Sequence, residues 1–119
     1  MKRFLTKRIY DPPTATDGRR ILADRLWPRG LSKDKAAIDY WAKAAAPSDE
    51  LRRWYQHDAA KWDEFRERYF AELDANPEAV AELRGNLAPE GEVTTLLFAT
   101  QELELNNAAA LRAYLARRA

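Results

Sequence analysis

Residues 93–99 constrain the fold of this 119-residue chain more than any other segment. The run Val-Thr-Thr-Leu-Leu-Phe-Ala carries no charge and is rich in β-branched and large apolar side chains, which is typical of a strand buried on both faces. A second run, 20–26, also places apolar residues on both faces of a predicted strand. Because a strand buried on both faces needs a layer on either side, these segments predict a sheet sandwiched between helices.

Helical patterns lie between the predicted strands. The clearest helix covers 59–75, where large apolar residues recur at three- and four-residue spacing and form one stripe. These residues are Trp62, Phe65, Tyr69 and Leu73. The other predicted elements are a strand at 4–10, a short helix at 33–38, an extended or irregular piece at 39–46, helices beginning near 48 and 77, and a last helix capped by Asn106 or Asn107. This order predicts an α/β fold, a single-domain sandwich with a small, mostly parallel sheet flanked by helices.

Composition narrows the class of protein further. No repeat, low-complexity tract or linker divides the sequence, so we expect one domain over residues 1–119. Hydrophobic residues make up 46% and charged residues 33%, as in a folded globular domain. No apolar run approaches the roughly 20 residues of a spanning helix, and no hydrophobic stretch follows the basic N-terminus as it would in a secretory signal. The absence of cysteine excludes disulfides, thiolate catalysis and iron–sulfur clusters. We therefore expect a cytoplasmic protein with no membrane partner.

Charge is distributed unevenly along the chain. Residues 1–35 contain ten Lys and Arg against four Asp and Glu, whereas residues 36–119 contain ten against fifteen. A basic first third indicates either a positive face that meets an anion or pairing with the acidic remainder. Internal pairs and solvated charges are the commoner explanation of such a pattern.

The segment 25–35 is the best candidate for a binding site. It follows a predicted strand, and ligands of open α/β sheets bind beyond the carboxyl ends of the strands. Guanidinium groups, a glycine that permits close backbone approach and a serine-capped helix start all favour an anion there. The predicted ligand-binding residues are Arg25, Trp27, Arg29, Gly30, Ser32 and Lys33. The alternative is a structural loop, in which Asp11 and Asp24 pair with the arginines and Trp27 fills the core.

Three further residues are candidates for catalysis. His57, the only histidine, could act as a general base beside Asp58, and Asp24 is a second candidate base. Asn106 could orient a substrate. The alternative for His57 is an exposed residue just before a helix that Asp58 caps. One histidine, no cysteine and no acidic cluster with ligand spacing argue against a metal site, and nothing in the sequence identifies a cofactor.

Two segments make the chain resemble a known family. Residues 8–12 (Arg-Ile-Tyr-Asp-Pro) and 20–30 (Arg-Ile-Leu-Ala-Asp-Arg-Leu-Trp-Pro-Arg-Gly) are similar to the YeaO-like family, catalogued as domain of unknown function 488, and the similarity continues to Asn106. The resemblance implies a cytosolic α/β protein without an established activity. Many members place a histidine beside the asparagine that is Asn106 here. This chain has Leu105 and Asn107 at those positions, so a mechanism that needs that imidazole does not carry over.

These observations leave three classes of function open. The first is binding of a phosphate-bearing or other anionic ligand, either a nucleotide or a nucleic acid, through the 25–35 segment. The second is a small enzyme acting on an anionic substrate with His57 or Asp24 as base, which requires His57, Arg29 and Asn106 to meet in one cleft. The third is an interaction or assembly protein that forms a homo-oligomer. We rank binding first, and whether the chain is an enzyme stays open.

Overall fold

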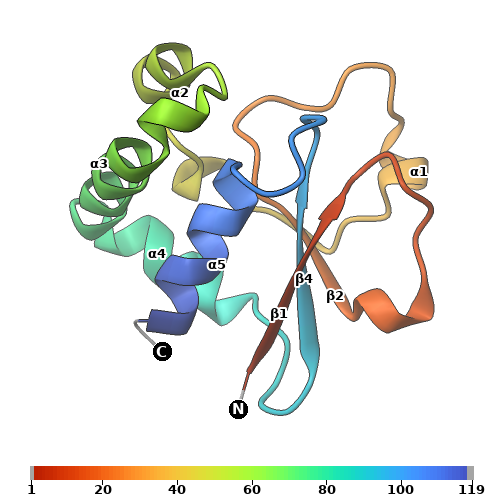
Figure 1. Cartoon of the computed structure of the whole chain (residues 1–119). Coiled ribbons are helices and arrows are strands. Elements are labelled where there is room, and N and C mark those ends of the chain that lie inside the picture. Colours follow the sequence, from red (N-terminus) through yellow and green to blue (C-terminus); the bar gives the residue numbers. More distant parts are fainter. Residues whose placement is uncertain (1, 118–119) are drawn as a thin grey trace.

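The computed structural model describes residues 2–117 and contains one sheet (Figure 1). Its strands are β1 (Arg3–Arg8), β2 (Arg19–Leu22), β3 (Tyr40–Trp41) and β4 (Val93–Phe98). They are arranged in the order β1-β4-β2-β3, and each neighbouring pair is parallel. The uncharged run predicted to be buried is therefore the inner strand β4, which pairs with β1 on one side and β2 on the other.

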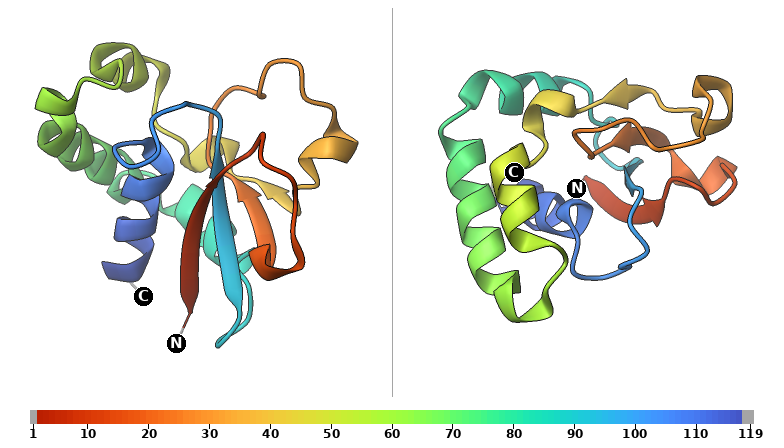
Figure 2. Two further views of the ribbon diagram at one scale, coloured as in Figure 1. Left: turned by 45° about the vertical axis from the view of Figure 1, so that its right-hand side comes forward. Right: turned by 90° about the horizontal axis from the view of Figure 1, so that it is seen from above.

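The helices are distributed unequally over the two faces of the sheet. They are α1 (Lys33–Ala36), α2 (Asp49–Tyr55), α3 (Trp62–Asp74), α4 (Pro77–Gly85) and α5 (Asn107–Arg117), with short 3-10 helices η1 (Ala15–Asp17), η2 (Lys43–Ala45) and η3 (Ala59–Lys61). Helices α2 to α5 lie on one side of the sheet, and α1 lies on the other (Figures 1 and 2). The predicted α/β class with helices flanking a parallel sheet is confirmed, although within residues 2–117 the second face is covered only by the four-residue α1, the short η1 and loops.

Alternation along the inner strands explains the two cores. Ile21 and Leu96 belong to the core under α2 to α5, whereas their neighbours Leu22 and Leu97 belong to the smaller core near α1. All four side chains are fully buried. Because successive side chains of a strand point to opposite faces, an uncharged strand can supply both cores at once.

Some predicted elements are shorter than expected, among them the helix predicted at 33–38, which ends at Ala36. The strand predicted at 20–26 ends at Leu22, and the Ala23 amide makes a last ladder-like bond to the Leu97 carbonyl at 2.9 Å. The Asp24 carbonyl then accepts the Trp41 indole N–H at 2.7 Å, so the chain leaves the sheet there. The segment 39–46 contains only the two residues of β3, followed by η2. Between residues 2 and 117, no helix combines the length and apolar character needed to span a bilayer.

Candidate functional site

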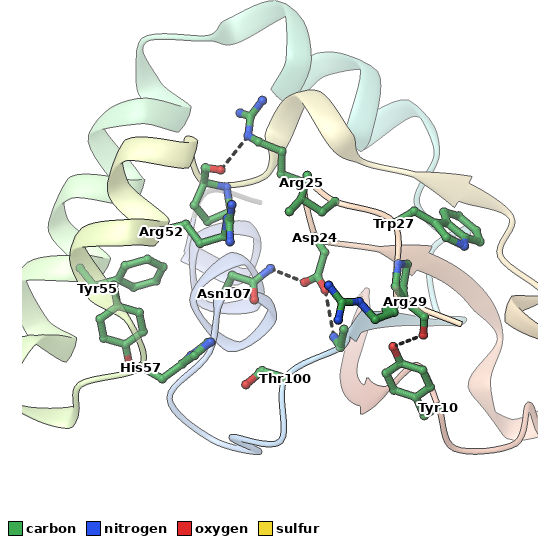
Figure 3. Close-up of a pocket in the computed structure, with 15 residues that line it drawn as sticks. Tyr10, Asp24, Arg25, Trp27, Arg29, Arg52, Tyr55, His57, Thr100 and Asn107 are labelled. Atoms are coloured by element: carbon green, nitrogen blue, oxygen red, sulfur yellow. Dashed lines mark hydrogen bonds between the residues drawn. The ribbon is translucent and has the colours of Figure 1, made fainter. Parts of the chain in front are cut away.

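A cavity of about 380 Å³ lies at the carboxyl edge of the sheet (Figure 3). The loops that follow β2 and β4, the C-terminal end of α2 and the first residue of α5 contribute to its lining. Its polar lining residues are Asp24, Arg25, Arg29, Arg52, His57, Thr100 and Asn107, and its aromatic ones are Tyr10, Trp27, Tyr55 and Phe65. This location agrees with the general rule for ligand sites in parallel α/β sheets.

Asp24 connects three elements at this edge. Its Oδ2 accepts the backbone N–H of Ala99 at 3.0 Å, and its Oδ1 accepts an N–H of the Asn107 side chain at 2.9 Å. Burial raises the pKa of the Asp24 carboxyl, and hydrogen bonds from Asn107 and Ala99, with the positive charges of His57 and Arg52, oppose that effect only in part. Asp24 is therefore a poorly solvated carboxyl whose orientation is held from two sides.

Asn107 presents an acceptor to the cavity. Its side-chain nitrogen donates to Asp24 and also to the Ala23 carbonyl, at 2.8 Å. Both N–H groups of the amide are thus in use. Within residues 2–117, the amide oxygen has no hydrogen bond, and Figure 3 shows it turned away from Asp24.

Arg25 holds the loop in place, although not through the expected carboxylates. Its Nε donates to the Pro47 carbonyl at 2.9 Å and its Nη2 to the Ala46 carbonyl at 3.3 Å. Figure 3 shows the guanidinium directed away from Asp24. Arg25 therefore connects the loop after β2 to the segment before α2. Its hydrogen-bond acceptors are backbone carbonyls, not the carboxylates of Asp24 or Asp11.

The guanidinium groups of Arg29 and Arg52 remain available to a ligand. The Arg29 side chain is exposed and makes no hydrogen bond or ion pair with residues 2–117, while its backbone carbonyl accepts the Tyr10 hydroxyl at 2.8 Å. Arg52 contacts Asp49 at 3.2 Å, but the two side chains are 46% and 50% exposed. Exposed pairs of this kind contribute little and are easily exchanged for a ligand.

His57 also reaches the cavity. It has a φ of 55° and follows Gln56 with a φ of 47°, so two successive residues adopt the left-handed conformation that favours glycine. The imidazole meets the Tyr55 ring edge-on at 5.7 Å between centroids, and Asp58 caps η3 by accepting the Ala60 amide at 3.0 Å. Such backbone strain is concentrated at functional sites in proteins, and here it sets the position of a cavity-lining side chain.

The comparisons with known proteins agree with the sequence resemblance. The family model described as the inactive DUF488-N3 subclade matches residues 3–119. The chain belongs to this DUF488 subclade. It is 41% identical over 109 residues to an uncharacterized protein of Mycobacterium tuberculosis, covering 92% of this chain and 90% of the relative. It is 40% identical to the uncharacterized protein YeaO of Escherichia coli, covering 92% and 93% of the two chains. No solved structure matches it.

Not every residue predicted from the sequence lines the cavity of this DUF488 protein. Asp24, Arg25, Trp27, Arg29 and His57 do. The other predicted site residues, which are not part of its lining, are Gly30, Ser32, Lys33 and Asn106. The predicted ligand-binding residues at the start of the 25–35 segment therefore line this cavity, and the later ones do not.

Asn106 has a structural role in the described chain. It is fully buried, accepts the Ala109 amide at 2.9 Å as the cap of α5, and donates to the Glu102 carbonyl at 2.8 Å. The geometric condition for the enzyme hypothesis is thus met by His57 and Arg29 but not by Asn106. Its neighbour Asn107 occupies the cavity instead.

Ser32 and Lys33 belong to a feature too small to form a site by itself. Ser32 caps α1 by accepting the Lys35 amide at 3.1 Å, as predicted. That helix has only four residues, so few aligned peptide dipoles support an anion at its start.

Sequence reasoning did not include Arg52, Asn107, Thr100 or Tyr55 in the site. Arg52 and Tyr55 lie on α2, and only the packing of this helix beside the sheet brings them to the carboxyl edge. Thr100 lies between β4 and α5 and Asn107 is the first residue of α5; from this part of the chain the sequence analysis selected only Asn106. The paired asparagines were the available signal, since one can cap the helix while the other points elsewhere.

Proposed function

We propose that this protein binds a small phosphate-bearing anion in the cavity at the carboxyl edge of its sheet. The observation that carries the proposal is the presence of two guanidinium groups, Arg29 and Arg52, on one cavity, neither of them held by a buried carboxylate. A guanidinium presents a planar fork of N–H donors that matches phosphate oxygens.

The charge balance of the cavity supports an anion. Its lining contains three arginines and one carboxyl group, Asp24. One of the arginines, Arg25, is already bound by the carbonyls of residues 46 and 47. Helix α5 begins at Asn107 on the same cavity, and the N-terminal end of a helix carries a partial positive charge. We expect His57 to add to this attraction whenever it is protonated.

Binding without turnover is the function we favour over catalysis. The matching subclade is described as inactive, and the chain lacks the histidine that the family resemblance places beside Asn106. Among the lining side chains only Thr100 carries an aliphatic hydroxyl, and no cysteine is present anywhere in the sequence. The cavity therefore offers cations and hydrogen-bonding groups without an activated nucleophile.

A pair of arginine variants on one helix tests the anion site. Arg52→Gln removes a cavity cation, whereas Arg53→Gln removes a neighbouring exposed cation that does not line the cavity. By isothermal titration with inorganic phosphate, sulfate and mononucleotides, we expect Arg52→Gln and Arg29→Gln each to weaken binding roughly tenfold or more, because a hydrogen bond to a charged group contributes about 1.5–3 kcal/mol. Arg53→Gln should bind like the wild type.

Two results would contradict the proposal. One is the absence of saturable binding by every anion tested at low ionic strength. The other is an equal loss for Arg52→Gln and Arg53→Gln, which would indicate attraction by net charge alone. Phosphorus NMR of the same mixtures tests the assignment to binding, since release of phosphate from a nucleotide would make the protein an enzyme. For a short oligonucleotide, a steep fall of affinity with salt would indicate contacts along a nucleic-acid backbone.

A further inference from the structure

The cavity contains hydrogen-bond acceptors as well as cations. Asp24 and Asn107 lie side by side on its wall, joined by a hydrogen bond of 2.9 Å. An anion without hydrogen-bond donors would gain nothing from these two side chains. The Asp24 carboxylate repels it, and both N–H groups of the Asn107 amide already donate to the protein. This combination points to a ligand that carries donors in addition to its negative charge.

The acceptors are fixed in orientation and still have capacity. Each Asp24 oxygen accepts one hydrogen bond, from Asn107 or from the Ala99 amide, and a carboxylate oxygen can accept two. The Asn107 oxygen accepts none from the described residues. A ligand with two adjacent N–H groups would therefore meet an acceptor pair that the protein already holds in place.

The remaining lining leaves room for a planar group of moderate size. The volume of about 380 Å³ is far more than one phosphate fills. This volume lies at the lower end of small-molecule sites. Of the aromatic residues, Tyr10 is 40% exposed, whereas Tyr55 and Phe65 are 2% exposed and the Trp27 ring packs against Trp41. The exposed ring of Tyr10 beside Arg29 gives a planar base an aromatic surface to pack on.

On the basis of the proposed function, we infer that the ligand is a nucleoside monophosphate whose base presents two adjacent N–H donors, as guanine does. The base edge donates to Asp24 and its neighbour Asn107, and the phosphate is bound by Arg29 and Arg52. The poor solvation of the Asp24 carboxyl fits this role, because donors from the ligand would supply the stabilisation that water does not.

The test compares nucleotides that share the phosphate and differ at the base edge. Wild-type protein is titrated with GMP, IMP, AMP and inorganic phosphate at one ionic strength. IMP lacks one of the two donors, and AMP replaces the ring N–H by an acceptor that would face the carboxylate. We expect GMP to bind roughly tenfold tighter than IMP and tighter still than AMP, since a bidentate base contact discriminates by about that amount.

Asp24→Asn separates this inference from the anion site itself. The variant should bind GMP, IMP and AMP with similar affinity, and it should bind inorganic phosphate at least as tightly as the wild type because a negative charge has left the cavity. If wild-type protein binds phosphate but binds GMP and AMP equally, the guanine assignment is wrong while the anion site stands. If phosphate and all nucleotides fail to bind, the proposed function is wrong. The wild-type comparison decides between these outcomes even where Asp24→Asn does not fold.

Discussion

Replacing Asp17 by asparagine tests the electrostatics of the basic first third. Asp17 is only 5% exposed and accepts hydrogen bonds from Arg20 at 2.6 Å, from Lys7 at 3.0 Å and from the Thr14 amide at 3.0 Å. Burial acts to raise the pKa of Asp17, but the Thr14 amide, Lys7, the Thr14 hydroxyl and Arg20 together outweigh it and lower the pKa from 3.8 to about 2. Asp17→Asn removes the charge that these groups stabilise.

The pKa sets the size and pH range of the effect. At about 1.36 kcal/mol per pKa unit, a decrease from 3.8 to about 2 corresponds to roughly 2.4 kcal/mol of folding free energy. Because the pKa is lower in the folded state, this contribution is fully present above pH 4 and is lost as the pH falls towards 2. Leaving Arg20 buried without its carboxylate adds to the cost at neutral pH. We expect Asp17→Asn to lose about 3 kcal/mol at pH 7.

Urea unfolding of both proteins between pH 2 and pH 7 measures this difference. The gap between wild type and Asp17→Asn should be largest at pH 7 and should narrow steadily below pH 4. Asp63→Asn is the matched control, since it breaks the pair with Arg66 while the Asp63 side chain is 90% exposed. A gap that stays constant down to pH 2, or an equal loss for Asp63→Asn, would refute the assignment of the stabilisation to the buried charge.

Three further predictions concern stability. Gly18→Ala should destabilise the protein severely, because a Cβ there would lie 2.1 Å from the Val93 carbonyl oxygen and φ is +61°. Gly85→Ala is the control, since a Cβ there would meet no atom within 4 Å. Thermal unfolding should show Gly85→Ala to be neutral or stabilising by up to about 1 kcal/mol. Leu96→Ala should cost about 2–5 kcal/mol in urea unfolding, since Leu96 is fully buried in the central strand. Asn106→Ala should cost about 1 kcal/mol through loss of the α5 cap and should leave phosphate binding intact; a loss of binding at unchanged stability would restore Asn106 to the site.

The sequence predicts the elements best where one pattern extends over many residues. Strand β4 and helix α3 follow from an uncharged run and from an apolar stripe, and the buried residues of α3 are Phe65, Tyr69 and Leu73. The Ser32 cap and the start of α2 next to Ser48 are also found where their short-range signals place them. The length of strand β2 is overestimated, because it depends on whether a partner strand continues beside it. Here the Trp41 indole N–H donates to the Asp24 carbonyl in place of a strand partner.

The site residues likewise fall into two groups: some can be predicted from nearby sequence, and others depend on long-range packing. Residues of the loop after β2 can be marked from the sequence, since Asp24, Arg25 and Arg29 follow a recognisable strand. Arg52 and Asn107 cannot, because their contribution depends on how α2 and α5 pack against the sheet. The same packing decides that Arg25 is bound by carbonyls of residues 46 and 47 while Arg29 is left open.

The sequence by itself determined the α/β class, the inner position of β4, the helix starts and the family, because periodicity, capping and motif residues act within a few positions of the chain. Only the tertiary structure decided which charges are neutralised and which remain available to a ligand. That outcome depends on distances between groups far apart in the sequence, such as Asp24 and Asn107, which no local pattern encodes.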